Sequence, residues 1–210
     1  MLTVCIMSYK YGHLASHAIE SVLAQTRKPD EILLVDDGVA DCRDVAKRYG
    51  IMLIEREKNR GIVDNFNNIL FEAVTTDRVM FLGADNWLRP DALERMMEID
   101  ADIVSSEIAL FGTEADRFAK IVGAIESRDG FTIWRMHNDR DINSTNYIHG
   151  SAIYNVELAR SVGGYIRGEG VNSDEDHMLW KKMLKAGASY GHVCEPLLYY
   201  RRHVGNFQKI

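Results

Sequence analysis

Short apolar runs alternate with amphipathic stretches along the first half of the chain. The runs that predict strands are residues 2–7, which are expected to be buried, and 31–35, 52–55 and 79–82. The stretches with apolar positions at helical spacing are residues 13–25, 41–49 and 63–73, followed by a helix that opens at Pro90. Strands that alternate with helices form sheets covered on both faces, so the pattern predicts an α/β fold with a mostly parallel central sheet flanked by helices.

Three of these strands end in polar clusters. The clusters are Ser8-Tyr9-Lys10, Asp36-Asp37-Gly38 and Asp85-Asn86. The carboxyl ends of parallel strands meet at one edge of the sheet, which is where such sheets bind ligands. We therefore expect the three clusters to face one crevice.

The second half of the chain has a less regular pattern. Strands are predicted at 102–111 and 196–203, helices at 155–162 and 174–185, and a long polar surface loop at 132–147. The chain contains no internal repeat or flexible linker. We expect a single domain over 1–210, with a nucleotide-binding half over 1–100 and an acceptor or catalytic half over 101–210.

Composition and charge argue against several classes of function. Hydrophobic residues make up 46% and charged residues 27% of the 210 positions, which is ordinary for a globular protein. A net charge of −6 offers no basic surface for nucleic acid, and no apolar run approaches the roughly 20 residues of a membrane span. Three scattered cysteines, and an apolar start too short for a secretory signal, predict a reducing, cytoplasmic location.

Asp36 and Asp37 follow the second predicted strand. Carboxylates at this place accept hydrogen bonds from a nucleobase imide or a ribose hydroxyl. They also suit a turn that caps the next helix. The residues alone leave both interpretations open.

Asp85 offers a hard oxygen ligand at the end of the fourth predicted strand. Such oxygens suit Mg²⁺ or Mn²⁺, and an ion here would stabilise a departing diphosphate. Turn chemistry before a helix is the alternative. Near the end of the chain, Arg201 and Arg202 could neutralise diphosphate and His203 could bind the same ion, or the three could form a solvated basic tail.

Ser173 to Asp176 open a predicted helix. Acidic and polar residues at a helix start are favoured by capping and by the helix dipole. A carboxylate at this place could also take a proton from an acceptor hydroxyl. The glycine-rich residues 163–170 before it would let backbone approach a sugar closely.

The order of these segments is more specific than any one of them, and it resembles the inverting family 2 glycosyltransferases over nearly the whole chain. The matching segments are 3–10, 18–26, 35–38, 59–61, 83–86, 175–180 and 200–203, together with Asn67. The resemblance implies a GT-A fold, a UDP-sugar donor, a Mn²⁺ or Mg²⁺ ion, and a glycan or glycoprotein acceptor.

The same resemblance implies roles for individual residues. Asp176, in the segment that resembles Glu-Asp-x-x-Leu-Trp, would be the catalytic base. Asp85 and His203 would hold the metal. The donor would lie against Ser8, Tyr9, Asp36, Asp37, Asn67, Ala84, Asp85 and Arg202.

Two departures from the family pattern stand out. Gly83 replaces the first acid of the Asp-x-Asp motif, so metal binding rests on Asp85, the diphosphate and His203. Phe66 stands where the family's Ala-Arg-Asn segment has its arginine, and Arg60 or Lys58 could substitute for it.

A narrower resemblance concerns the multidomain glycosyltransferases of large algal viruses. The chain is similar to their N-terminal rhamnosyltransferase domains. This similarity implies a UDP-L-rhamnose donor, a β-linked product, a longer parent polypeptide with other domains, and the host cytoplasm as location. We expect the acceptor beside residues 137–147 and 149–151.

Two alternatives belong to other classes of function. A sugar-phosphate nucleotidyltransferase shares the alternating pattern and a metal-binding Asp, but usually has a glycine-rich basic loop where this chain has residues 8–13 with a single glycine. A non-catalytic domain that binds a nucleotide sugar would fit the incomplete Asp-x-Asp motif.

Overall fold

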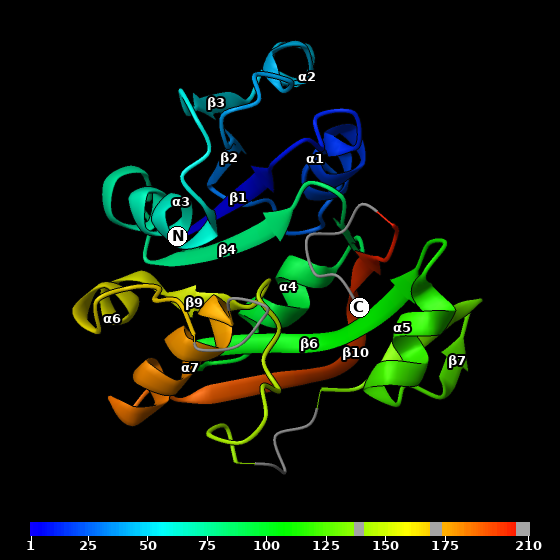
Figure 1. Ribbon diagram of the computed structural model, residues 1–210. Coiled ribbons are helices and arrows are strands. Elements are labelled where there is room, and N and C mark those ends of the chain that lie inside the picture. The colour runs from blue at the N-terminus through cyan, green and yellow to red at the C-terminus, as the bar shows by residue number, and fades with distance from the viewer. Residues whose placement is uncertain (137–140, 169–173, 205–210) are drawn as a thin grey trace.

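The computed structural model describes residues 1–136, 141–168 and 174–204 (Figure 1). Strands and helices alternate in the first half, as predicted. The elements are β1 (Leu2–Ser8), α1 (Ala15–Leu23), β2 (Glu31–Asp36), α2 (Arg43–Tyr49), β3 (Met52–Glu55), α3 (Ile62–Asn68), the π-helical turn η1 (Ile69–Ala73) and β4 (Arg78–Gly83). Helix α2 ends at Gly50, whose φ of 64° is the left-handed conformation that favours glycine.

The second half contains more elements than its pattern predicted. They are β5 (Trp87–Leu88), α4 (Ala92–Met97), β6 (Ile103–Phe111), α5 (Ala115–Val122), β7 (Glu126–Arg128), β8 (Phe131–Trp134), β9 (Ile153–Asn155), α6 (Val156–Ser161), α7 (Glu175–Lys185) and β10 (Tyr190–Arg201). Among the described residues, no helix has the length and apolar character to cross a membrane.

The predicted loop over 132–147 is wrong at its start. Strand β8 occupies Phe131–Trp134 and pairs with β6 and β7. Strands β7 and β8 form a hairpin closed by Asp129 and Gly130, whose φ angles of 52° and 82° suit a two-residue turn. Residues 137–140 of the predicted loop lie outside the described residues.

The described strands join in one mixed sheet with the order β3-β2-β1-β4-β9-β6-β10-β5. The longer ladders are parallel: β1 with β2 and β4, β2 with β3, and β6 with β10. The antiparallel pairs involve only two or three residues each. The predicted α/β architecture with a central sheet is therefore confirmed, with antiparallel strands inserted in its second half.

Helices cover both faces of the sheet (Figure 1). One apolar core lies under α1, α2, α4 and α5, and the other lies under η1, α6 and α7. Neighbouring residues of β1 alternate between them, with Val4 and Ile6 in the first core and Cys5 in the second. The two cores hold the carboxyl ends of β1, β2 and β4 at one edge, where polar side chains are left to meet a ligand.

Candidate active site

The carboxyl ends of β1, β2 and β4 lie side by side. The amide of Asp37 donates to the carbonyl of Ser8 (2.9 Å), and the amide of Ala84 donates to the carbonyl of Met7 (2.9 Å). The three polar clusters therefore share one edge, as predicted. The side chains of Ser8 and Ala84 are buried there, whereas Tyr9 is 39% exposed at the rim.

Asp36 shapes the turn after β2. Its two carboxylate oxygens accept hydrogen bonds from the four successive amides of residues 39–42, at 2.8–3.1 Å. Burial raises the pKa of Asp36, but the four amides lower it, and the net pKa lies below its ordinary value. This geometry is that of the turn-and-cap interpretation, and it holds the neighbouring Asp37 in place.

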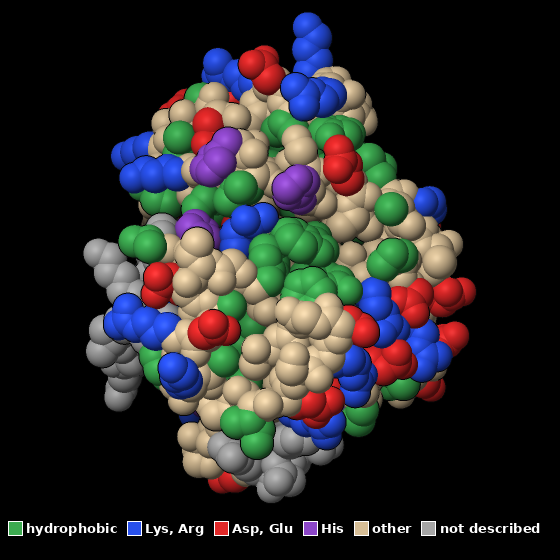
Figure 2. Space-filling model, turned by 90° about the vertical axis from the view of Figure 1, so that its right-hand side faces the viewer, with side chains coloured by type: hydrophobic (Ala, Val, Ile, Leu, Met, Phe, Trp, Pro, Cys, Tyr) green, Lys and Arg blue, Asp and Glu red, His purple; other side chains and the backbone are tan. Residues whose placement is uncertain are grey.

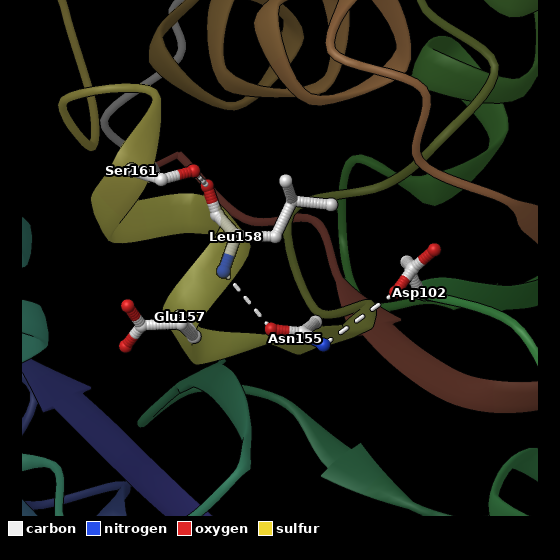
Figure 3. Close-up of a pocket in the computed structure, with 5 residues that line it drawn as sticks. All are labelled: Asp102, Asn155, Glu157, Leu158 and Ser161. Atoms are coloured by element: carbon white, nitrogen blue, oxygen red, sulfur yellow. Dashed lines mark hydrogen bonds between the residues drawn. The ribbon is translucent and has the colours of Figure 1, made fainter.

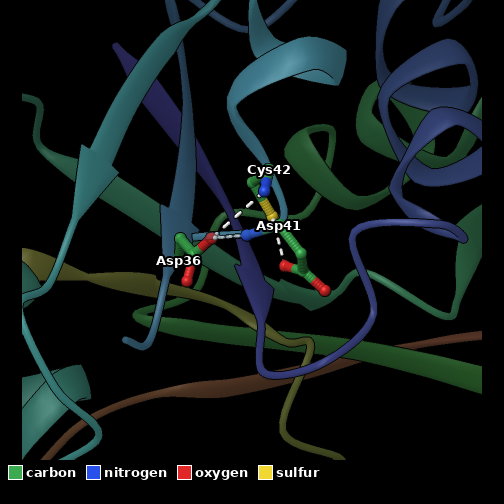
Figure 4. Close-up of side chains that lie close together, drawn as sticks. All are labelled: Asp36, Asp41 and Cys42. Carbon is green, nitrogen blue, oxygen red and sulfur yellow. Dashed lines mark hydrogen bonds between the residues drawn. The ribbon is translucent and has the colours of Figure 1, made fainter. Parts of the chain in front are cut away.

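Asp36, Asp41 and Cys42 bring two carboxylates and a thiol together, with ligand atoms within 4.8 Å of one another (Figure 4). The group does not suit a metal ion. Asp36 already accepts four amides, and Asp41 accepts from the amide of Gly12 (3.1 Å) and from the Cys42 thiol (3.4 Å). Burial raises the pKa of the Cys42 thiol to about 12, which disfavours the thiolate that a metal would need.

Asp37 presents an unused acceptor at the same edge. Its side chain is buried, and its Oδ1 has no hydrogen-bond partner among the described residues. Burial raises the pKa of Asp37, and the amide of Arg60 and the charge of Arg56 offset only part of that rise. A buried carboxylate oxygen without a partner fits a ligand that supplies an N–H or O–H donor.

Asp85 and His203 form a pair that fits a divalent ion. His203 Nε2 lies 3.4 Å from Asp85 Oδ2, and the imidazole packs edge-on against Tyr11 (5.5 Å between centroids). Two ligands about 2.1 Å from one octahedral ion, at right angles, are about 3 Å apart. Burial raises the pKa of Asp85, which His203 offsets in part, so a cation here would compensate a buried negative charge.

The space at Gly83 explains the missing first acid of the Asp-x-Asp motif. A Cβ on Gly83 would lie 2.7 Å from Asn86 Nδ2 and 2.9 Å from Asp85 Oδ1. Asn86 in turn accepts a hydrogen bond from the amide of Arg201 (2.9 Å). The side chains of Asp85 and Asn86 therefore fill the space beside Gly83, and the bond from Arg201 to Asn86 joins the end of β4 to β10.

The two arginines after Tyr200 point in different directions. Arg202 is 1% exposed, with its guanidinium 4.2 Å from the Phe118 ring centroid, so the prediction of a solvated basic tail is wrong for this residue. Arg201 donates to the carbonyl of Asp85 (3.1 Å) and lies over the Trp87 ring. Figure 2 shows hydrophobic, basic and histidine side chains gathered on the face beside these strand ends.

Asp176 stands in the first turn of α7 and is half-buried. Its Oδ1 accepts hydrogen bonds from the His177 amide (2.7 Å) and from Asn146 Nδ2 (3.4 Å). Burial, followed by the charge of Glu175, raises the pKa of Asp176 to about 7. A carboxylate with a pKa near 7 is suited to accept a proton at neutral pH.

Tyr200 connects the two acidic centres. Arg202 Nη1 lies 3.3 Å from the Tyr200 hydroxyl. Burial raises the pKa of Tyr200, Arg202 lowers it, and the charges of Asp85 and Asp176 both raise it. Asp85 and Asp176 are therefore both close enough to Tyr200 for their charges to act on it, a relation that the sequence motifs did not reveal.

Two residues of the donor-side segment on α3 make contacts within the protein. Asn67 Nδ2 donates to the Tyr165 carbonyl (2.8 Å), and Asn67 Oδ1 accepts from the Tyr165 amide (2.7 Å). Phe66 stacks on Phe81 (4.8 Å) in the core. Arg56, which sequence reasoning did not consider, supplies the positive charge that acts on Asp37.

The expected acceptor side is described only in part. Asn146 contacts Asp176, and residues 149–151 lie beside it. Residues 137–140 and the glycine-rich residues 169–170 lie outside the described residues. A shallow hollow on another part of the molecule is lined by Asp102, Asn155 and α6 (Figure 3), and its polar groups bond mainly to one another and to Ser189.

The chain has recognisable relatives among known proteins. The sequence pattern of glycosyl transferase family 2 matches residues 3–163. An uncharacterized glycosyltransferase of Nostoc is 38% identical over 104 residues, which are 47% of this chain and 32% of the relative. An uncharacterized glycosyltransferase of Haemophilus influenzae is 28% identical over 201 residues, which are 89% of this chain and 69% of the relative.

Solved structures show the same fold. Staphylococcus aureus TarS 1–349 in complex with UDP-GlcNAc has a TM-score of 0.70 at 17% identity, over 98% of this chain and 59% of that chain. Mannosyltransferase PcManGT from Pyrobaculum calidifontis, in complex with GDP-Man and Mn²⁺, has a TM-score of 0.65 at 16% identity, over 95% and 56%. The fold is therefore GT-A, as predicted.

The chain spans less than two thirds of the Nostoc relative and of both solved chains. The family pattern, in contrast, covers well over half of this chain and includes the Asp36-Asp37 and Asp85 turns. The chain belongs to glycosyl transferase family 2.

Proposed function

We propose that the chain moves a sugar from a UDP-sugar to a glycan hydroxyl with inversion, with Asp176 as the base. One observation carries the proposal. Asp176 is a half-buried carboxyl with a pKa of about 7, and its charge reaches the same tyrosine as that of Asp85. A carboxyl with a pKa near 7, such as Asp176, can take a proton from a hydroxyl at neutral pH. The buried Asp85 fits a cation that would stabilise the phosphate as it leaves.

The nucleotide lies across the ends of β1, β2 and β4. The unpartnered Oδ1 of Asp37 accepts the imide N–H of uracil, while Asp36 holds the turn and Ser8, Tyr9 and Ala84 line the edge. The complex of TarS with UDP-GlcNAc supports a uridine nucleotide in this fold.

Asp85 and His203 would hold a Mn²⁺ or Mg²⁺ ion. The 3.4 Å between their ligand atoms and the burial of Asp85 support this assignment, as does the Mn²⁺ in the PcManGT complex. When bound, such an ion neutralises diphosphate charge and makes it a better leaving group. Arg202, buried beside Tyr200, adds positive charge on the same side.

Asp176 removes the proton of the acceptor hydroxyl. The hydroxyl oxygen forms a bond to the anomeric carbon as the bond from that carbon to UDP breaks, and the proton stays on the Asp176 carboxyl until solvent takes it. One displacement inverts the anomeric configuration and needs only one carboxylate. Asn146 and the His177 amide orient Asp176 for this step.

The best candidate for the donor is UDP-L-rhamnose, which would give a β-linkage. It is supported by the resemblance to the viral rhamnosyltransferase domains, and the acceptor would lie beside residues 141–151. Other domains of a longer polypeptide would supply the remaining steps of glycan assembly.

A panel of UDP-sugars with Mn²⁺, followed by UDP release and by NMR of the product's anomeric centre, tests the proposal. We expect turnover with one UDP-sugar and an inverted product. A retained configuration would contradict the single displacement. Pyrophosphate release from a nucleoside triphosphate and a sugar phosphate would favour a nucleotidyltransferase, and tight UDP-sugar binding without turnover would favour a binding domain.

A further inference from the structure

Residues 146–152, which we call the bracket, enclose the Asp176 carboxylate. Asn146 Nδ2 donates to Asp176 Oδ1 (3.4 Å), and a Cβ on Gly150 would lie 3.2 Å from Oδ2. The backbone at Gly150 therefore passes close to the carboxylate and leaves little room for a side chain between them. A shift of Gly150 would change how much water reaches Asp176.

Two hydrogen bonds fix the bracket to the elements around it. Trp180 Nε1, on α7, donates to the carbonyl of Ile148 (3.0 Å). His149 Nε2 accepts a hydrogen bond from the amide of Ser106 on β6 (3.2 Å). Trp180 is fully buried and His149 is 6% exposed. His149, adjacent to Gly150 in the chain, thus ties the bracket to the centre of the sheet.

The bond to Ser106 fixes the protonation state of His149. A ring nitrogen that accepts an amide hydrogen bond carries no proton, so the neutral ring holds its proton on Nδ1. Burial, with a smaller contribution from the charge of His192, lowers the pKa of His149 to about 3. The ring is therefore neutral at physiological pH, so its hydrogen bond to Ser106 does not change with pH in that range.

We infer that His149 is a positioning residue that, through Ser106, holds Gly150 against Asp176 and keeps water from the carboxylate. The inference rests on the proposed role of Asp176 as the base. It adds a buried residue on the expected acceptor side, whose side chain bonds to Ser106 and which acts on the base by setting its environment.

The charged and titratable groups around Asp176 lie outside the bracket. They are Glu175 and Asp174 at the start of α7, Tyr165 before the second gap in the described residues, and Tyr200 on β10. Displacing the bracket leaves these charges where they are and changes the hydration of Asp176. The pKa of Asp176 should then fall from about 7 toward its ordinary value.

Two polar substitutions at one position form a matched pair. His149→Gln places a carbonyl oxygen where Nε2 lies and retains an acceptor for the Ser106 amide. His149→Asn is equally polar but too short to reach it. A ¹³C NMR titration of the Asp176 carboxyl, identified by its loss in Asp176→Asn, follows the pKa without any substrate.

We expect the wild type and His149→Gln to titrate near pH 7, and His149→Asn to titrate about one pH unit or more lower. Equal midpoints in all three folded proteins would overturn the inference. Wild-type ¹⁵N shifts of His149 provide a second measurement that needs no variant. Nε2 must stay unprotonated at pH 5, and protonation of the ring at pH 6 would show that His149 does not accept the Ser106 hydrogen bond.

The titration separates this inference from the proposed function. If no UDP-sugar turns over while the midpoints shift as expected, the enzymatic proposal fails and the positioning of Asp176 stands. Calorimetry with UDP should give the same affinity in His149→Asn as in the wild type, because Asp37 and Asp85 lie on other elements. An affinity loss equal to that of a donor-site variant would place His149 in the donor site instead.

Discussion

Asp176→Asn tests whether burial and neighbouring charges raise the pKa of Asp176, through the pH dependence of the free energy of unfolding. Burial, then the charges of Glu175 and Asp174, raise the pKa of Asp176 from 3.8 to about 7. A carboxyl whose pKa is higher in the folded state than in the unfolded state favours folding while it is protonated. The wild type should therefore lose stability as pH rises from about 4 to about 7, and lose no more above that.

The size of the effect follows from the shift. Three pKa units correspond to about 4 kcal/mol, and partial exposure of Asp176 to water reduces this to about 2 kcal/mol. Asparagine carries no charge and keeps an oxygen for the His177 amide, which now donates to Oδ1 at 2.7 Å. Asp176→Asn should thus be about 2 kcal/mol more stable than the wild type at pH 8, with about a third of that gain at pH 5.

Urea unfolding of both proteins at pH 5 and pH 8 measures this difference. Asp116→Asn is a matched control, because it removes an exposed acid from the first turn of α5, and it should give no gain at either pH. In a chain of this size, about 2 kcal/mol corresponds to roughly 4–8 °C in Tm. A gain that does not grow with pH would refute the reasoning, because it could not come from a buried charge.

Four further substitutions distinguish residues that hold the structure from residues that bind the donor or assist the reaction. Asp36→Ala should cost about 2–4 kcal/mol in urea unfolding because four amides lose their acceptor, whereas Asp37→Ala should leave stability nearly unchanged and weaken UDP binding about tenfold or more by calorimetry; equal stability losses would contradict the division of roles. Asp85→Ala should remove the Mn²⁺ dependence of UDP binding, and an unaltered dependence would exclude Asp85 as a ligand. Gly150→Ala places a methyl carbon 3.2 Å from Asp176 Oδ2, so kcat should fall about tenfold with UDP affinity intact; an unchanged kcat would show that the contact is unimportant.

The first half of the fold could be predicted because local and long-range signals agree there. The buried strands β1 and β2 are each followed by a helix with its own apolar face, and parallel pairing brings the ends of β1, β2 and β4 together. The shared edge of Ser8, Asp37 and Ala84 follows from that topology alone.

The second half depends on contacts that are distant in the chain. Strand β9 has only three residues and is defined by its pairing with β4 and β6. Helix α5 and the β7–β8 hairpin did leave signals, in the helical spacing of Ala115, Phe118 and Ala119 and in the Asp129-Gly130 turn, that a closer analysis of the pattern could have used.

Individual side chains were harder to predict than segments. Motif position alone could not show that Asp36 is saturated by amides while Asp37 has an open oxygen, because the two are adjacent and chemically identical. The sequence likewise could not show that the amide of Asn67 bonds to the Tyr165 backbone. Only three-dimensional packing distinguishes a residue that holds the site from one that meets the ligand.

The measurement closest to the central claim is turnover by Asp176→Asn with the UDP-sugar that the wild type uses, alongside UDP affinity by calorimetry. If Asp176 is the base, kcat should fall by about 10²–10⁴ while the affinity for UDP is unchanged, because the carboxylates proposed to bind UDP lie at the ends of β2 and β4 and not on α7. Full turnover by purified, folded Asp176→Asn would contradict the account.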